Sequence, residues 1–182
     1  MKQKVLNLYG PPCAAKSTIA AYVFSMLKMH GVNCELINEF AKDMSWEKND
    51  SVMSDQLFMF ANQWHKMYRC YGQTDLLITD SPLLLSPLYN SDSTIDRQFR
   101  EIVYAMDDKF FNINYLIKRV VKYDTTGRVH DERQSDQIAV ELKKMLDSSH
   151  VPYTELPGTL ESANSILLDI LKMFGKENLT AI

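Results

Sequence analysis

The sequence predicts a three-layer α/β fold, in which a mainly parallel sheet of five strands lies between helices. Short apolar runs alternate with stretches of helical period along the chain, and this is the pattern of strands joined by crossover helices. A length of 182 residues with 46% hydrophobic residues also fits one domain with a full core. We therefore expect a single domain over residues 1–182, with ligands at the carboxyl ends of the strands.

The strands are expected where apolar residues run together, and the helices where apolar residues recur every three or four positions. The strand segments are residues 5–9, 35–37, 76–79, 115–117 and 153–156. A first helix is expected over residues 17–30, with Gly31 as its terminator. Further helical stripes run through 57–68 after a cap at Ser54, through 95–110, through 138–146 and through 160–174.

The overall composition favours a soluble protein of the cytosol. Three widely spaced cysteines without a Cys-x-x-Cys pair are expected to be reduced thiols. The sequence has neither a cleavable leader pattern nor an apolar stretch long enough for a bilayer, so no membrane partner is expected. A net charge of −3 argues against a protein that coats duplex nucleic acid. The oligomeric state is left open, and a homodimer is compatible with the sequence.

Residues 10–18 carry the most specific motif of the chain. They read Gly-Pro-Pro-Cys-Ala-Ala-Lys-Ser-Thr, which approaches the phosphate-loop pattern G-x-x-x-x-G-K-S/T between a strand and a helix. In this pattern backbone N–H groups surround phosphate oxygens at the positive end of a helix. We expect Lys16 to reach the β- and γ-phosphates of ATP, and Ser17 to bind Mg²⁺. The nucleotide-contacting set is Gly10, Cys13, Ala14, Ala15, Lys16, Ser17 and Thr18. The alternative is an ordinary strand–turn–helix with a surface lysine.

Two residues of this loop need comment. Ala15 stands where the pattern has its second glycine, so it brings a Cβ into a place that we expect to be tightly packed. Cys13 lies near a helix N-terminus and Lys16, which favours its thiolate. Cys13 either fills space or is a site where oxidation or alkylation blocks nucleotide binding.

Two carboxylates follow predicted strands and are candidates for the chemistry. Asp80 comes directly after residues 76–79 and would hold Mg²⁺ opposite Ser17. The alternative is a cap for the next helix. Glu39 follows residues 35–37 and would accept the proton of an acceptor hydroxyl or orient it, unless it is an exposed glutamate at a helix start. Lys42 would pair with an acceptor phosphate or with solvent.

A basic stretch lies near the predicted fourth strand. Five cations fall between residues 118 and 133, around the turn at 124–127. Cations on a flap stabilise the charge that phosphoryl transfer places on equatorial oxygens. We expect Arg128 to act in this way and Arg119 to contact the nucleotide. The alternatives are a solvated loop or a nucleic-acid groove. The five cations are Lys118, Arg119, Lys122, Arg128 and Arg133.

With these segments placed, the chain resembles the phosphate-loop nucleoside and nucleotide kinases, most closely small bacterial and bacteriophage kinases related to nicotinamide riboside kinase and thymidylate kinase. The resemblance spans residues 4–158, but only the phosphate loop is specific within it. It includes residues 39–43 as the acidic segment, 77–82 as the acidic strand end, Gly127, Arg128, Glu132 and Asp136 as the lid and following helix, and Phe60 and Gln63 on the helix that lines the acceptor pocket.

This resemblance implies a sheet of order 2-3-1-4-5, a short lid at about residues 119–134, and transfer from MgATP to a nucleoside or nucleotide. Lys16, Glu39 and Arg128 would be its catalytic residues. Two alternatives stay open. One is a bacteriophage-type kinase acting on a modified base or an end within DNA, and the other is a regulator or ATPase without an acceptor.

Overall fold

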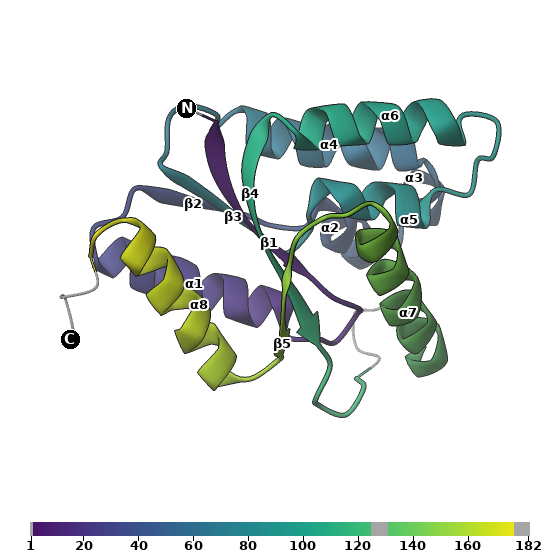
Figure 1. The fold of residues 1–182 in the computed structure, drawn as a ribbon. Coiled ribbons are helices and arrows are strands. Elements are labelled where there is room, and N and C mark those ends of the chain that lie inside the picture. Colours follow the sequence, from purple (N-terminus) through teal and green to yellow (C-terminus); the bar gives the residue numbers. More distant parts are fainter. Residues whose placement is uncertain (1, 125–130, 177–182) are drawn as a thin grey trace.

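The computed structural model describes residues 2–124 and 131–176, with the side chain of residue 50 outside the description (Figure 1). Its centre is a five-stranded sheet of order β2-β3-β1-β4-β5. All four neighbouring pairs are parallel. The predicted fold class and strand order are therefore confirmed. The strands are β1 (Gln3–Tyr9), β2 (Cys34–Ile37), β3 (Leu76–Thr79), β4 (Phe110–Lys118) and β5 (Thr154–Pro157).

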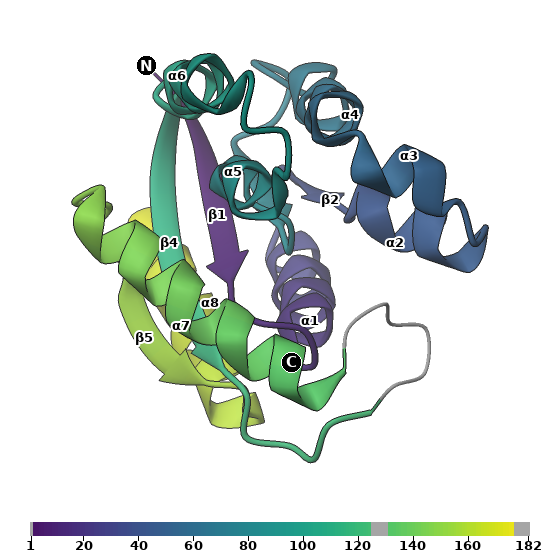
Figure 2. The ribbon, with the colours of Figure 1, turned by 90° about the vertical axis from the view of Figure 1, so that its right-hand side faces the viewer.

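Helices cover both faces of this sheet (Figures 1 and 2). One face carries α1 (Lys16–Met29) and α8 (Leu160–Met173), which pack against each other. The other face carries α4 (Gln56–Tyr68), a 3₁₀ turn η1 (Leu83–Leu85), α5 (Ser86–Tyr89), α6 (Asp96–Asp107) and α7 (Glu132–Ser148). Two shorter helices, α2 (Phe40–Trp46) and α3 (Asp50–Ser54), follow β2 and project beside α4.

The alternation of side chains along β1 explains why two cores form. Leu6 and Leu8 point to the α1–α8 side, whereas Val5 and Tyr9 point to the α4–α7 side. All four are fully buried. Buried strands in parallel sheets are apolar on both faces because helices cover each side. β1 is therefore fixed in the middle of the molecule, and the loop that follows it is firmly anchored at its start.

Several local predictions were wrong. Phe110 was placed in a helical stripe, but it begins β4, and α6 ends at Asp107. Ser54 does not cap α4; the Asp55 side chain accepts a hydrogen bond from the Phe58 N–H and is the cap. Helices α2, α3 and α5 were not predicted, and α7 begins at Glu132, six residues before the first apolar residue of the predicted stripe. Among the described residues, none of the helices is long and apolar enough to cross a membrane.

Candidate nucleotide-binding site

The phosphate loop leaves the carboxyl end of β1 at Gly10. The backbone of Gly10 has a φ of 148°, and a Cβ at this position would lie 2.5 Å from the carbonyl oxygen of Ile117 on β4. Side chains other than hydrogen are excluded by both the conformation and the space. Gly10 therefore allows the chain to turn sharply against the neighbouring strand.

The end of the loop passes directly into α1, which begins at Lys16. The Lys16 ammonium donates hydrogen bonds to the carbonyl oxygens of Gly10 (2.8 Å) and Pro11 (3.0 Å), and so it lies across the loop. Ser17 and Thr18 are exposed in the first turn of α1 and line the adjoining cleft. The N-terminus of a helix presents unpaired N–H groups and a partial positive charge, so this arrangement suits a phosphate group.

Ala15 adopts the left-handed conformation, with φ 64° and ψ 17°. Alanine rarely takes this conformation, which glycine adopts at no steric cost. The expectation of tight packing at this position was wrong, because Ala15 is half-buried and lines the cleft. The constraint on position 15 is thus a backbone angle, and the loop keeps that angle although it lacks the glycine.

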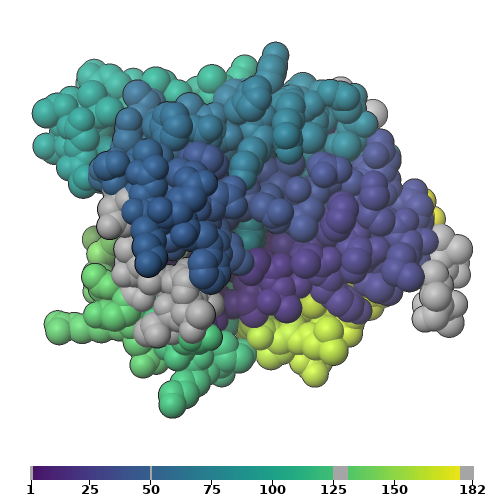
Figure 3. Space-filling model, turned by 180° about the vertical axis from the view of Figure 1, so that it is seen from behind, coloured from purple at the N-terminus to yellow at the C-terminus, as the bar shows by residue number. Residues whose placement is uncertain are grey.

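A cleft of about 820 Å³ joins this loop to the segments that follow β2 and β3. In Figure 3 the molecule is seen from behind, and the blue α2–α3 region lies beside the purple N-terminal region. The carboxyl ends of parallel strands meet at one edge of the sheet, which explains why distant segments share the cleft. Residues 12–18 line one side. The other lining residues include Glu39, Phe40, Lys42, Trp46, Met59, Gln63, Asp80 and Tyr89.

Asp80 lines the cleft, and only 6% of its surface is exposed. It does not cap a helix, since Pro82 holds the N-cap position of η1. Burial raises the pKa of Asp80 above its ordinary value, while Lys16, two backbone N–H groups and Lys42 act in the opposite direction. Within the described residues, the Oδ1 atom of Asp80 is buried without a hydrogen-bond partner.

An unpartnered buried carboxylate oxygen is costly unless a cation or donor joins it. The unpartnered Oδ1 atom is compatible with a cation at Asp80, and Ser17 lines the same cleft; their binding of Mg²⁺ stays a prediction. The described residues include no cluster of three or more histidine, cysteine or acidic side chains suited to a metal ion. A pair of protein ligands fits Mg²⁺ nonetheless, because this ion usually retains waters and shares phosphate oxygens.

Glu39 faces the cleft at the start of α2, where it occupies the N-cap position. Burial raises the pKa of Tyr89 on α5 most, and the charge of Glu39 raises it further. Tyr89 lines the cleft as well. Sequence reasoning missed Tyr89 because α5 is only four residues long and has no periodic signal.

The predicted acceptor helix is α4, and its two named residues lie in different places. Gln63 lines the cleft, where its side-chain oxygen accepts a hydrogen bond from the Phe40 N–H at 3.1 Å. Phe60 is 4% exposed and packs edge-to-face on Phe99, with ring centroids 5.7 Å apart. Phe60 therefore belongs to the core, and Gln63 is the residue of this pair that lines the cleft.

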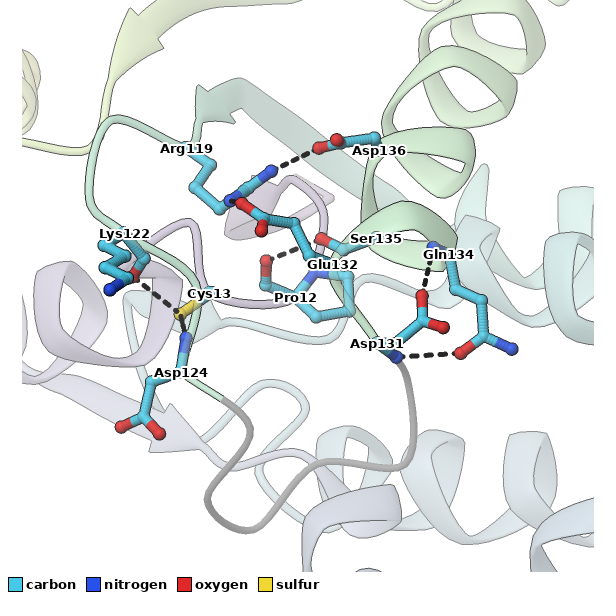
Figure 4. A network of polar contacts seen from close by, with 10 residues as sticks. All are labelled: Pro12, Cys13, Arg119, Lys122, Asp124, Asp131, Glu132, Gln134, Ser135 and Asp136. Atoms are coloured by element: carbon cyan, nitrogen blue, oxygen red, sulfur yellow. Dashed lines mark hydrogen bonds and ion pairs between the residues drawn. The ribbon is translucent and has the colours of Figure 1, made fainter.

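Two of the four described cations of the basic stretch, Lys118 and Arg119, form ion pairs with carboxylates. Arg119 forms ion pairs with Glu132 (2.7 Å) and Asp136 on α7 (Figure 4). Lys118 pairs with Glu155 at 2.6 Å. Arg119 does not line the cleft, and its contact with a nucleotide stays a prediction. Arg128 lies outside the described residues.

Comparison with solved structures shows that the fold is similar to that of a deoxyadenosine kinase. The structure of deoxyadenosine kinase from M. mycoides with bound dATP matches with a TM-score of 0.58, covering 94% of this chain and 100% of that one at 17% identity. A second structure of this enzyme, with products dCMP and a flexible dCDP, gives a TM-score of 0.57, with 94% and 98% coverage at 15% identity. This similarity establishes the fold alone.

Sequence comparisons add little to this result. No protein-family model matches the chain. RecA proteins from Campylobacter jejuni subsp. jejuni and subsp. doylei are 28% identical over 94 residues. The match covers 47% of this chain and 27% of RecA, so the chain spans about a quarter of the length of these relatives.

Proposed function

We propose that this protein is a kinase that transfers the γ-phosphate of ATP, with Mg²⁺, to a nucleoside or nucleotide. One observation carries the proposal: a single cleft is lined by the phosphate loop, by Asp80 and by Glu39. A loop that only binds a nucleotide as a switch needs no carboxylate placed for an acceptor, whereas transfer uses a residue that orients the nucleophile. The cleft volume of about 820 Å³ is near the upper end for small-molecule pockets, which supports a site for two ligands.

The phosphate loop would bind the phosphates of the donor nucleotide. Backbone N–H groups of the loop and of the first turn of α1 would bind phosphate oxygens, and Lys16 would move from its two carbonyl partners to the phosphates. Mg²⁺, held by Ser17 and Asp80, would supply charge neutralisation between the phosphates. Exchange of the Lys16 partners is inexpensive, because carbonyls are neutral whereas phosphate is an anion.

The acceptor would bind on the side of the cleft that α2 forms. Glu39 would accept or orient the proton of the attacking hydroxyl. The walls there include the aromatic rings of Phe40 and Trp46 and the side chain of Met59. Aromatic and apolar walls with a few polar groups are typical of a pocket for a base. Gln63 and Lys42 are the polar groups that would distinguish bases and acceptor phosphates.

The test is an ADP-release screen with MgATP across nucleosides, nucleoside monophosphates, nicotinamide riboside and modified oligonucleotides. We expect ADP release with at least one small acceptor. Lys16→Ala should abolish transfer while the protein remains folded. Glu39→Gln should lower turnover far more than nucleotide binding, whereas the matched control Glu47→Gln, at the exposed end of α2, should not. Nucleotide binding without transfer to any acceptor would instead support a regulator.

The DNA-directed alternative is weakened because two of the four cations that the structure describes in the basic stretch are already paired. Lys118 and Arg119 are engaged by carboxylates of β5 and α7, so their charge is partly neutralised before any phosphate backbone arrives. Oligonucleotide binding with a steep dependence on salt concentration would revive that alternative.

A further inference from the structure

A serine on α7 holds the phosphate loop from outside the cleft. Ser135 is fully buried, and its hydroxyl donates a hydrogen bond of 3.0 Å to the carbonyl oxygen of Pro12 (Figure 4). A serine inside a helix ordinarily bonds to a carbonyl one turn earlier. Ser135 instead bonds to a segment 123 residues away in sequence, so this contact is tertiary.

Helix α7 does not need Ser135 for its own start. The side chain of Asp131 accepts a hydrogen bond from the Gln134 N–H, and the side chain of Gln134 accepts one from the Asp131 N–H, which completes a capping box. The first turn of α7 is therefore a preformed support. Its position is further fixed by the ion pairs from Glu132 and Asp136 to Arg119.

The next residue of the loop is tied to the segment that Arg119 begins. The Cys13 sulfur accepts a hydrogen bond from the Asp124 N–H at 3.4 Å and lies 4.0 Å from the Lys122 carbonyl oxygen. Figure 4 shows that the loop, this segment and α7 meet at these contacts. Pro12 and Cys13 are thus held by α7 and by the segment that follows β4.

The hydrogen bond from Ser135 matters because it orients the peptide group between Pro12 and Cys13. In a trans peptide the carbonyl and the following N–H point in opposite directions, and the described chain has no cis peptide bond. When Ser135 fixes the Pro12 carbonyl outward, the Cys13 N–H is fixed in the opposite direction. Residues 11 and 12 are both proline and have no N–H. Cys13 is therefore the first residue after Gly10 that can offer a backbone donor to a phosphate.

We propose that Ser135 is a positioning residue for nucleotide binding, which sets the orientation of the first backbone donor of the phosphate loop through the Pro12 carbonyl. The proposal rests on the proposed function, because it assumes that the loop binds the phosphates of a nucleotide. It predicts that affinity for MgATP depends on a residue that does not line the cleft.

The first experiment compares Ser135→Ala with Ser148→Ala. Ser148 lies on the same helix, is exposed and bonds only one turn back, to the Met145 carbonyl. We expect Ser135→Ala to weaken MgATP binding about two- to tenfold, the range for one neutral hydrogen bond, and Ser148→Ala to leave it unchanged. Equal affinities for the two variants would overturn the proposal. If Ser135→Ala does not fold, Ser135→Cys keeps the volume with a weaker donor, and unchanged MgATP affinity in that variant would overturn it equally.

The second experiment needs no nucleotide, so it separates this proposal from the proposed function. In a Cys70→Ala background, a thiol reagent modifies Cys13 in the loop and Cys34 in the core, and mass spectrometry follows each site. Cys13 is half-buried and Cys34 fully buried. Ser135→Ala should accelerate modification of Cys13 severalfold without changing the rate at Cys34. Equal acceleration at both sites would indicate general loosening, and no acceleration at Cys13 would show that the loop does not depend on Ser135; either result refutes the proposal.

Discussion

Replacement of Ala15 by glycine should stabilise the protein, although glycine usually destabilises. The left-handed conformation of Ala15 (φ 64°) costs about 1–2 kcal/mol for a residue with a Cβ. Glycine removes that cost but adds about 0.4–1 kcal/mol of conformational entropy to the unfolded chain. The net effect is an increase of about 0–1.6 kcal/mol in the free energy of unfolding, with a central value of about 0.8 kcal/mol. For a domain of this size, the central value corresponds to about 1–4 °C in Tm.

A matched control is available in the helix that follows. Ala21 is exposed inside α1 (Lys16–Met29), where the backbone is helical. Ala21→Gly should lower the free energy of unfolding by about 1 kcal/mol, the usual penalty for glycine within a helix. The same chemical change therefore has opposite signs at two positions six residues apart. Urea unfolding at equilibrium and thermal unfolding measure both variants, and a loss of stability in Ala15→Gly similar to that in Ala21→Gly would refute the reasoning.

Of three further predictions, two concern carboxyl groups whose pKa is raised by burial, and the third concerns a close approach of the backbone at Gly158. Burial raises the pKa of Asp80, so ionisation of this carboxyl lowers the stability of the fold as pH rises. Asp80→Asn should therefore keep or raise stability at pH 7, as urea unfolding would show. The same variant should abolish the Mg²⁺ dependence of nucleotide binding, as MgATP titration would show. Burial, with the neighbouring charge of Asp108, raises the pKa of Asp107 to about 7. The folded state then binds the Asp107 proton more tightly than the unfolded state does. The free energy of unfolding should therefore fall by about 2–4 kcal/mol as pH rises from about 4 to 7. Asp107→Asn should remove this pH dependence, as urea unfolding across that range would show. A Cβ on Gly158 would lie 2.6 Å from the Ala14 carbonyl oxygen, so Gly158→Ala should lower stability by about 1–3 kcal/mol and weaken MgATP binding; an unchanged Tm and MgATP affinity would contradict this.

The central parts of the fold were predictable because their signals are local. β1 and β3 contain short runs that are mainly apolar, and α1 follows a loop with a recognisable pattern. The carboxylates at the ends of β2 and β3 were found for the same reason, since a polar residue after a buried strand stands out. Strand order followed from a resemblance, and no local pattern contains it.

The remaining parts depend on tertiary contacts that a sequence pattern does not contain. β4 begins five residues before the predicted strand, because Asn112 and Asn114 interrupt the apolar run. Their polarity is satisfied inside the protein, where the Asn7 side chain donates hydrogen bonds to both at 2.8 and 2.9 Å. Ser135 gave no signal, since a serine within a helical stripe has many ordinary explanations. Its contact with Pro12 becomes visible only in three dimensions.

The central place of β1 in the sheet order divides the molecule into two functional halves. On one side, β3 and β2 lead to the segments that carry Asp80 and Glu39; on the other, β4 and β5 lead to the contacts of Arg119, Ser135 and Gly158 around the phosphate loop. Both halves border the phosphate loop, which follows β1. Under the proposed function, substitutions in residues 40–59 are therefore expected to change the choice of acceptor while affinity for the donor is preserved. A set of variants confined to that segment would give a family of enzymes with one common donor site and many acceptors.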